Sequence, residues 1–452
     1  MEQVVIAGGG PTGLMLACEL KLGGADPLVL ERLAEPSGES RAGGLHPRTM
    51  EILDMRGMIE PFLAEGRRLP SAHFAGLPID FTGQDTRYPF LLVILQRRIE
   101  RLLEARAREL GVRIRREVEV TGLAPHDDHV AITSTAGTLR AEYLVGCDGG
   151  RSTVRKLAGI GFPGTPATMT AILGDVELAD PPAEPFFQVK GEGGVYSVLV
   201  FEPGWYRVIT NEFGVVADRD APIGVEELRS ALRRLAGTDF GLHSPRWVSR
   251  YSDAARLATA YRSGRVLLAG DAAHVHYPAG GQGLNTGVQD AVNLGWKLAA
   301  VVGGAHDQEL LETYASERRP VAERVLANTR AQTALTRVDP QSDALRSVFG
   351  SLIRLPEVNR TLAGMVSALD VRYPLGEGAG QRAPDRVLPD GSRLFDHLHD
   401  ARPILLRPSS SAVVAPPGVA VVDTDGPALL VRPDGHVAWS EAMGAEALNR
   451  WC

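Results

Sequence analysis

The chain has 452 residues, enough for two or three domains, and its 44% hydrophobic and 23% charged residues are ordinary for a globular protein. A net charge of −7 excludes the basic surface that nucleic-acid binding requires. No apolar run reaches the length of about 18 residues that a membrane span needs. Cys18, Cys147 and Cys452 form no CxxC pair, so we expect no disulfide, no bound metal and a reducing, cytoplasmic location. The apolar run Val4–Ala7 begins so early that we expect no signal peptide.

The hydrophobic pattern predicts a βαβ unit at the start of the chain, followed by an alternation of further strands and helices. The predicted elements of the first half are a strand at 3–8, a helix at 13–22, a strand at 27–31, a helix at 96–110 and a strand at 143–148. Short alternating runs over 170–260 predict an antiparallel sheet. They are followed by a strand at 265–271, a mostly helical stretch at 284–335 and, after a break at 374–388, four short strands with a turn at 433–435.

A glycine fingerprint, Gly8-x-Gly10-x-x-Gly13, separates the first predicted strand from the first helix. In a dinucleotide-binding unit the first glycine permits a tight turn, the second lets the backbone approach the pyrophosphate, and the third lets the helix pack on the strand. Glu31 ends the next strand, where a carboxylate hydrogen-bonds a ribose hydroxyl. A purely structural turn is the alternative, but strand, helix and acidic residue are all in place, so we predict a dinucleotide site.

A second glycine-rich segment follows another strand, which ends in Asp271. Its loop contains Gly280, Gly281 and Gly283. These glycines let the backbone approach a flat ring, and Leu284 and Asn285 open a helix whose N-terminus favours negative charge. Thr286 and Gln289 have the spacing of a capping box. An ordinary helix cap explains this segment equally well when it is taken alone. The two segments together favour FAD, with its adenosine at one site and its isoalloxazine ring at the other.

A third segment, Asp148–Arg155, begins with an Asp-Gly turn and taken alone indicates a surface turn. With the first fingerprint and Gly270-Asp271, however, it resembles the three signatures of class A FAD-dependent aromatic hydroxylases, the para-hydroxybenzoate hydroxylase type. The runs Ser40–Thr49 and Gly281–Leu298 are similar to the actinomycete branch that acts on aromatic polyketides, angucyclines especially, close to the rifampicin monooxygenases. The segment 380–452 resembles that branch's thioredoxin-like tail without its CxxC.

The resemblance implies where the adenosine and phosphate part of FAD would be bound. The Thr12 amide would contact phosphate, while Glu31 and Arg32 would hold the adenosine. Val120 would meet the adenine through its backbone. Asp148 belongs to the stretch that serves both FAD and the nicotinamide nucleotide in the family.

The resemblance also implies the positions around the flavin. Gln96 would contact the central part of FAD, Asp271 the pyrophosphate and ribityl region, and the amides of Leu284 and Asn285 the flavin ring. Arg41 would contact the central part of FAD and help admit the nicotinamide, and Pro278, just before the flavin loop, would shape the environment of the re side of the ring. The general base stays open; its candidates by position are His46, His274, His276 and Tyr277.

The reaction that the resemblance implies has two halves. NADPH binds transiently and reduces the non-covalently bound FAD, and the reduced flavin then adds O2 to give a C4a-hydroperoxide that hydroxylates an aromatic ring. Arg151 and Arg155 suit a phosphate fork, which favours NADPH over NADH. The alternatives are rifampicin-type inactivation of an antibiotic, Baeyer–Villiger oxygenation of a polyketide, and a non-enzymatic flavoprotein that sequesters an antibiotic.

The expected fold is α/β, with a Rossmann-like FAD domain, an antiparallel-sheet substrate domain and a C-terminal thioredoxin-like domain, in a monomer or homodimer. The FAD domain is predicted at 1–71, 95–168 and 261–375, the last part including the helical region. The substrate domain is predicted at 72–94 and 169–260, and the tail at 380–452. Apolar side chains in the substrate domain suit a large aromatic molecule, although a sheet core explains them equally well: Phe74, Phe81, Leu91, Leu92, Val198 and Val200.

Overall fold

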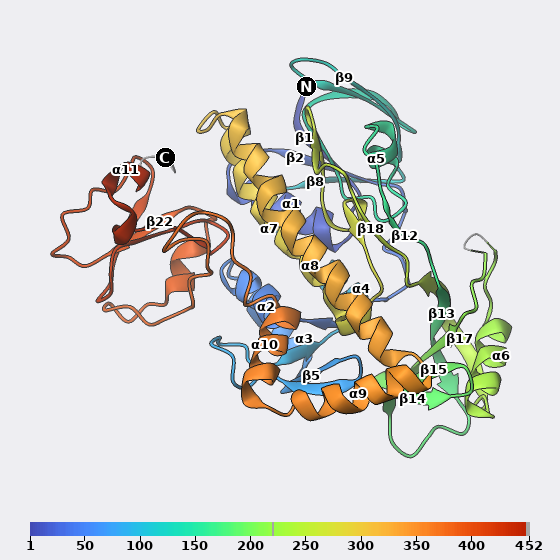
Figure 1. Ribbon diagram of the computed structural model, residues 1–452. Helices are drawn as coiled ribbons and strands as arrows, with labels where there is room; N and C mark the ends of the chain where they lie inside the picture. Colours follow the sequence, from blue (N-terminus) through green and yellow to red (C-terminus); the bar gives the residue numbers. More distant parts are fainter. Residues whose placement is uncertain (219–220, 449–452) are drawn as a thin grey trace.

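The computed structural model describes residues 1–218 and 221–448, so the predicted free cysteine at 452 lies outside the described residues. Figure 1 shows a sheet with helices α1 and α7 packed on it, a second sheet covered by α6, and a C-terminal part at the opposite side of the molecule from that second sheet. This mixed α/β architecture with a separate C-terminal sheet confirms the expected fold class. Among the described residues, no helix is both long and apolar enough to cross a bilayer.

The first sheet is the dinucleotide-binding type predicted from the βαβ pattern. Its order is β19-β20-β11-β1-β2-β8, with β9 and β10 as an antiparallel extension. The strands are β1 (Glu2–Ala7), β2 (Pro27–Glu31), β8 (Arg113–Arg116), β9 (Val120–Pro125), β10 (Val130–Ser134), β11 (Gly137–Gly146), β19 (Arg262–Ser263) and β20 (Val266–Leu268). The five strands from β20 to β8 are parallel, so their carboxyl ends lie at one edge, where open α/β sheets bind ligands.

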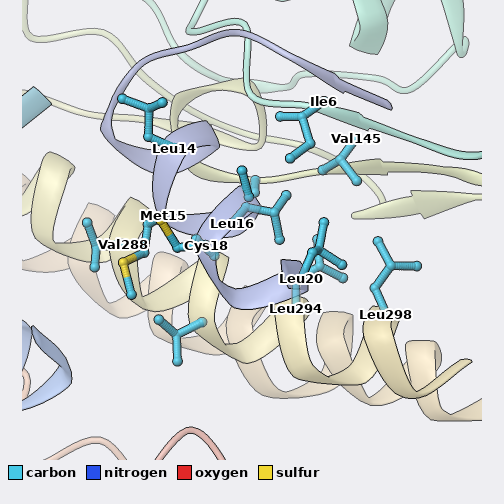
Figure 2. Close-up of a cluster of buried hydrophobic side chains, with 14 of the residues drawn as sticks. Ile6, Leu14, Met15, Leu16, Cys18, Leu20, Val145, Val288, Leu294 and Leu298 are labelled. Carbon is cyan, nitrogen blue, oxygen red and sulfur yellow. The ribbon is translucent and has the colours of Figure 1, made fainter. Parts of the chain in front are cut away.

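Helices α1 and α7 form two successive layers over one face of this sheet. Helix α1 (Pro11–Leu22) lies between the sheet and α7 (Gln282–Val302). Figure 2 shows the apolar side chains of α1 directed both toward the sheet and toward Val288, Leu294 and Leu298 of α7. Because α1 is buried on both sides, its sequence is apolar nearly all round. The packing places the N-termini of α1 and α7 in one layer of the molecule.

The second sheet is antiparallel, in the order β14-β15-β16-β13-β17. Its strands are β13 (Met169–Leu178), β14 (Phe186–Gly191), β15 (Gly194–Glu202), β16 (Trp205–Phe213) and β17 (Leu242–Ser252). Side chains alternate between the two faces of a strand. One face buries Val198 and Val208 against α6 (Val225–Ala236). The opposite face, which carries Arg207 and Asn211, is turned toward the first domain, because Arg207 donates to the carbonyls of Ser40 and Arg41.

The strands between residues 72 and 94 do not join that five-stranded sheet. β5 (Ser71–Phe74) pairs with β6 (Leu77–Asp80), while β7 (Leu91–Val93) pairs with β3 (Gly44–Leu45) and β4 (Arg67–Leu69). Most of the apolar side chains that suited an aromatic ligand are core residues: Phe74, Phe81, Leu92 and Val198 are buried. Of that set, Leu91 and Val200 are half-buried.

The remaining helices lie around these sheets. α2 (Pro47–Asp54), α3 (Ile59–Glu65), α4 (Gln96–Glu109) and α5 (Thr153–Leu157) belong to the first half of the chain. α8 (Glu312–Thr336) runs beside α7, and α9 (Pro340–Leu352) and α10 (Pro356–Ser367) follow it (Figure 1). The helix predicted at 96–110 and the mostly helical stretch at 284–335 are confirmed.

The C-terminal sheet has the order β23-β22-β24-β25. Its strands are β22 (Ile404–Arg407), β23 (Ala420–Asp423), β24 (Leu429–Val431) and β25 (Val437–Ser440), and β22 and β23 are parallel. The segments that join β22, β23 and β24 form no helix, which makes this tail simpler than a full thioredoxin-like domain. The predicted turn at 433–435 joins β24 to β25, but it is buried rather than exposed.

A buried ionic network fixes that turn to the rest of the molecule. Arg432 is 1% exposed and donates to both carboxylate oxygens of Glu317 on α8, at 2.8 Å each. Lys297 of α7 donates to the same carboxylate at 2.8 Å, and Arg432 also pairs with Asp434. On α2, Arg48 donates to the carbonyl of Asp434 at 2.7 Å. The C-terminal sheet is therefore attached to α2, α7 and α8 through paired charges.

Candidate flavin and substrate site

The turn between β1 and α1 has the geometry of a phosphate-binding loop. Gly8 has φ +109°, and a Cβ there would overlap the carbonyl of Cys147, while a Cβ on Gly13 would overlap the carbonyl of Gly8. A Cβ on Gly10 would meet nothing within 4 Å, so this glycine faces open space. Helix α1 begins with Pro11 and has no side-chain cap. Its first amides, including that of Thr12, are therefore left for an anionic ligand.

Glu31, the last residue of β2, bonds to this turn. Its Oε2 accepts a hydrogen bond from the Gly9 amide at 2.6 Å, and its Oε1 accepts one from the Leu33 amide at 2.9 Å. Arg32 beside it is exposed. The Val118 amide donates to the Glu31 carbonyl at 3.0 Å, which brings the start of β9 at Val120 next to the end of β2. The structure thus gathers all the residues predicted to surround the adenosine.

Asp148 accepts hydrogen bonds from the first turn of helix α5 with one carboxylate oxygen, while the other has no partner. Its Oδ2 accepts from the amides of Thr153 and Val154 at 2.7 and 3.0 Å, whereas its buried Oδ1 has no hydrogen-bond partner. The Arg155 guanidinium is buried, donates to the Ala272 carbonyl and lies 3.7 Å from the ring centroid of Phe162. Its donors are directed inward, so the interpretation of Arg155 as one arm of a phosphate fork does not fit the structure.

The second glycine segment forms the start of α7. Gly280 and Gly281 have φ of +70° and +67°, and Gly281 is the N-cap without a side-chain hydrogen bond. The helix begins at Gln282, two residues earlier than predicted. Thr286 is not its cap, because the Thr286 hydroxyl donates to the Gln282 carbonyl inside the helix. Glycine in a left-handed conformation supplies the cap instead, so Gly283 and Leu284 lie in the first turn, whose amides are unpaired within the helix.

Asn285 uses its side chain to fix this helix start. Its Oδ1 accepts from the His46 amide at 2.9 Å, and its Nδ2 donates to the carbonyls of Gly281 and Gly44 at 2.9 and 3.2 Å. Asp271 is exposed on the short 3-10 turn Gly270–Ala272 that follows β20. The predicted residues of the flavin end therefore lie on two neighbouring segments.

The two glycine segments meet at Thr12. A Cβ on Gly270 would come within 2.7 Å of the Thr12 Oγ1, and a Cβ on Gly287 would overlap the same atom. The β1–α1 turn, the segment around Asp271 and the first turns of α7 are thus in direct contact. This contact supports the prediction that one ligand extends from the N-terminus of α1 to the N-terminus of α7.

The segment 39–43 borders the site from the side of the second sheet. The Gln96 Oε1 accepts from the Ala42 amide at 3.1 Å. Arg41 is exposed and its Nη2 donates to Ser249 Oγ on β17 at 2.9 Å. Arg207 on β16 pairs with Asp175 at 2.8 Å and donates to the carbonyl of Arg41. The second sheet and the start of α4 therefore hold the segment that contains the predicted catalytic residue Arg41.

A tyrosine–asparagine cluster lies at the junction of the second sheet and the flavin loop 278–281. The Oδ1 of Asn211 on β16 accepts from the hydroxyl of Tyr277 at 2.9 Å and from that of Tyr251 on β17 at 3.3 Å. Pro278, the other predicted catalytic position, follows Tyr277 directly and is exposed. Sequence reasoning missed Asn211, because a polar residue in an alternating strand indicates a solvent-facing position.

The candidate histidines differ in their surroundings. His274 is buried and bonded to Asp290 at 2.7 Å, and Asp290 also accepts from Arg318 at 2.7 Å, which makes His274 structural. Burial lowers the pKa of His46 to about 4, and burial likewise lowers the pKa of His276, whose Nδ1 lies 2.8 Å from the Tyr277 carbonyl. Tyr277 has its pKa raised by burial. His46, His276 and Tyr277 are thus uncharged at neutral pH.

These features fit FAD. Two uncapped helix starts present amides to anionic groups. Gly10 faces open space beside them, and the unpartnered Oδ1 of Asp148 lies at the same edge of the sheet. In the described residues no cluster of His, Cys, Asp and Glu is arranged to hold a metal.

The comparison with protein families agrees with the geometry. The family described as "FAD binding domain" matches residues 1–329, and the one described as "Aromatic-ring hydroxylase, C-terminal" matches residues 377–452. The chain belongs to the FAD-dependent aromatic-ring hydroxylases. The expected family, the monooxygenase class and FAD as cofactor are confirmed.

Individual relatives match over essentially their full lengths. A 12-dehydrotetracycline 5-monooxygenase/anhydrotetracycline 6-monooxygenase of Streptomyces rimosus is 49% identical, with 99% of this chain and 98% of the relative covered. A rifampicin monooxygenase of Streptomyces venezuelae is 44% identical over 100% of this chain and 98% of its own. The solved structure of CabE, an aromatic hydroxylase from angucycline biosynthesis, has a TM-score of 0.93 at 41% identity, covering 100% of this chain and 99% of that one.

Proposed function

We propose that this flavoenzyme uses NADPH and O2 to hydroxylate a large aromatic molecule of the polyketide type. The observation that carries the proposal is the position of one face of the second sheet opposite the flavin loop. On that face Leu199, Ile209 and Phe213 are half-buried apolar side chains, and a flat, hydrophobic ligand would cover them favourably. The named activities of the tetracycline, rifampicin and angucycline relatives support the same substrate class.

In the proposed reaction NADPH, a proton, O2 and an aromatic C–H become NADP+, water and a phenol. The bound FAD supplies hydride acceptance and activation of O2. The amides of the α1 turn and Glu31 hold its phosphates and adenosine. The first-turn amides of α7 stabilise negative charge on the reduced ring, and Arg41 guides the nicotinamide. Asp271 binds the ribityl side, and Pro278 with the flavin loop shapes the space beside the ring and excludes water from it.

The test is incubation of the purified holoenzyme with NADPH and a panel of tetracycline-type, angucyclinone, anthraquinone and ansamycin compounds, under isotopically heavy O2. The expected result is NADPH consumption that depends on one class of compound, with one heavy oxygen atom in the product. Insertion between a carbonyl and its neighbouring carbon would indicate Baeyer–Villiger oxygenation instead. Tight binding without turnover would indicate sequestration, and conversion without NADPH would indicate a non-redox activity.

A further inference from the structure

One strand of the second sheet contacts both segments that border the flavin site. Arg207 and Asn211 lie four residues apart on β16, so their side chains are on the same face. Arg207 donates to the carbonyls of Ser40 and Arg41, while Asn211 accepts from Tyr277, which precedes the flavin loop. Ile209 lies between them on that face and is half-buried.

We propose that Asn211 is a positioning residue that latches the flavin loop 278–281 to the substrate sheet through Tyr277. The latch sets the position of this loop and thereby the rate at which NADPH reduces the FAD. This inference rests on the proposed function, because it concerns the same flavin and its reduction by NADPH.

At its first end the loop follows Tyr277, whose hydroxyl donates to Asn211 at 2.9 Å. Its second end is fixed by Gln282, whose Nε2 donates to the Ala279 carbonyl at 3.3 Å and to Asn328 on α8 at 3.2 Å. Between these points Gly280 and Gly281 have left-handed backbone angles, and the Gly281 amide bonds locally to the Pro278 carbonyl at 3.1 Å. Such a short, glycine-containing turn moves with its anchors, so a shift of Asn211 is passed to the backbone beside the flavin ring.

The carboxamide of Asn211 is suited to this role. It is 3% exposed, and its oxygen accepts from Tyr251 as well as from Tyr277. Two hydroxyls thus converge on one buried side chain, one from β17 and one from the residue that precedes the flavin loop. Removing the Tyr277 hydroxyl therefore releases the loop without disturbing the sheet hydrogen bonds of β16.

Two variants test the latch, and a third is the matched control. Tyr277→Phe keeps the ring and removes the hydroxyl, and Asn211→Ala removes the acceptor. Tyr206→Phe changes a half-buried tyrosine on the opposite face of the same strand. The measurement is stopped-flow reduction of the FAD by NADPH, with and without the compounds of the panel. We expect the rate of FAD reduction to fall about tenfold in both latch variants, which is the effect of losing one hydrogen bond, and to be unchanged in Tyr206→Phe.

A second readout uses the protein without FAD. In thermal melts of the apoprotein, Tyr277→Phe, Asn211→Ala and the double variant form a double-mutant cycle, and the latch predicts a double variant less destabilised than the sum of the singles. Equal rates of FAD reduction in all variants, or additive changes in melting temperature, would overturn the inference while leaving the proposed function intact. If the wild type is not reduced by NADPH at all, the proposed function fails, and the apoprotein cycle still decides whether the latch exists.

Discussion

The hydroxyl of Thr12 lies directly against Gly287, so closely that no side-chain carbon fits at position 287. Thr12 is in the first turn of α1 and Gly287 in the second turn of α7. The contact fixes the distance between two helix N-termini that are far apart in the sequence. Because each N-terminus is expected to hold one end of the FAD, this contact sets the length of ligand that the site accepts.

Gly287→Ala should therefore weaken both stability and FAD binding. The added methyl overlaps Thr12 Oγ1, and overpacking of this kind costs about 1–3 kcal/mol. Thr12→Ala removes the obstructing atom, so the double variant Thr12→Ala/Gly287→Ala should recover most of the loss. Urea unfolding and flavin fluorescence titration of the apoprotein measure the two effects. A single variant as stable as the wild type would contradict the contact.

Glu31→Ala should reduce FAD affinity about tenfold or more, because a hydrogen bond to a charged group contributes about 1.5–3 kcal/mol. The carboxylate also accepts from the amides of Gly9 and Leu33, so the loop itself loosens. Glu31→Gln, which keeps one acceptor, should lie between the wild type and Glu31→Ala. Unaltered affinity in titrations of all three apoproteins would exclude Glu31 from the adenosine site.

Arg432→Met should destabilise the protein by about 3–5 kcal/mol, since it leaves the buried carboxylates of Glu317 and Asp434 without their shared partner. Urea unfolding of the holoenzyme measures this directly. Arg393→Met is a suitable comparison, because the half-exposed Arg393 pairs with Asp385 in the same C-terminal region. The free energy of unfolding should fall less in Arg393→Met than in Arg432→Met.

The same network makes the free energy of unfolding depend on pH. Burial alone would raise the pKa of Glu317, but the charges of Arg432 and Lys297 outweigh it and lower the pKa to about 2. The unfolded chain takes up this proton at the ordinary value near 4.5. The stabilisation is therefore complete above pH 4.5 and is lost as the pH falls toward 2. The melting temperature of the wild type should fall through this pH window, and that of Glu317→Gln should fall less steeply.

Local signals in the sequence were sufficient for the first βαβ unit and for α4. Alternating and helical hydrophobic periods, with glycines at the stops, predict a strand at 27–31 and a helix at 96–110, and the structure has Pro27–Glu31 and Gln96–Glu109. The glycine fingerprint and Glu31 are likewise brought together as predicted, because both belong to one local unit. The sequence pattern predicts the start of α7 two residues late, because its cap is a glycine backbone conformation rather than a side chain.

Features that depend on distant partners were not predictable. The turn around Asp434 has ordinary turn residues, and its burial follows from Glu317, 115 residues from Arg432 in the sequence. Asn211 gains its importance from Tyr277, which only the folded chain brings near. Arg155 follows an Asp-Gly turn that suits phosphate, yet it is used to bridge to Ala272. In each case the deciding contact joins elements whose relative position no local pattern encodes.

The most direct test of the central claim, that α1 and α7 together hold one FAD, is a titration of the apoprotein with FAD and, separately, with FMN, which lacks the adenosine half. The account predicts one FAD bound per chain with strong quenching of flavin fluorescence, and FMN bound far more weakly because the α1 turn and Glu31 then contribute nothing. Equal affinity for FMN, or no uptake of FAD, would contradict it.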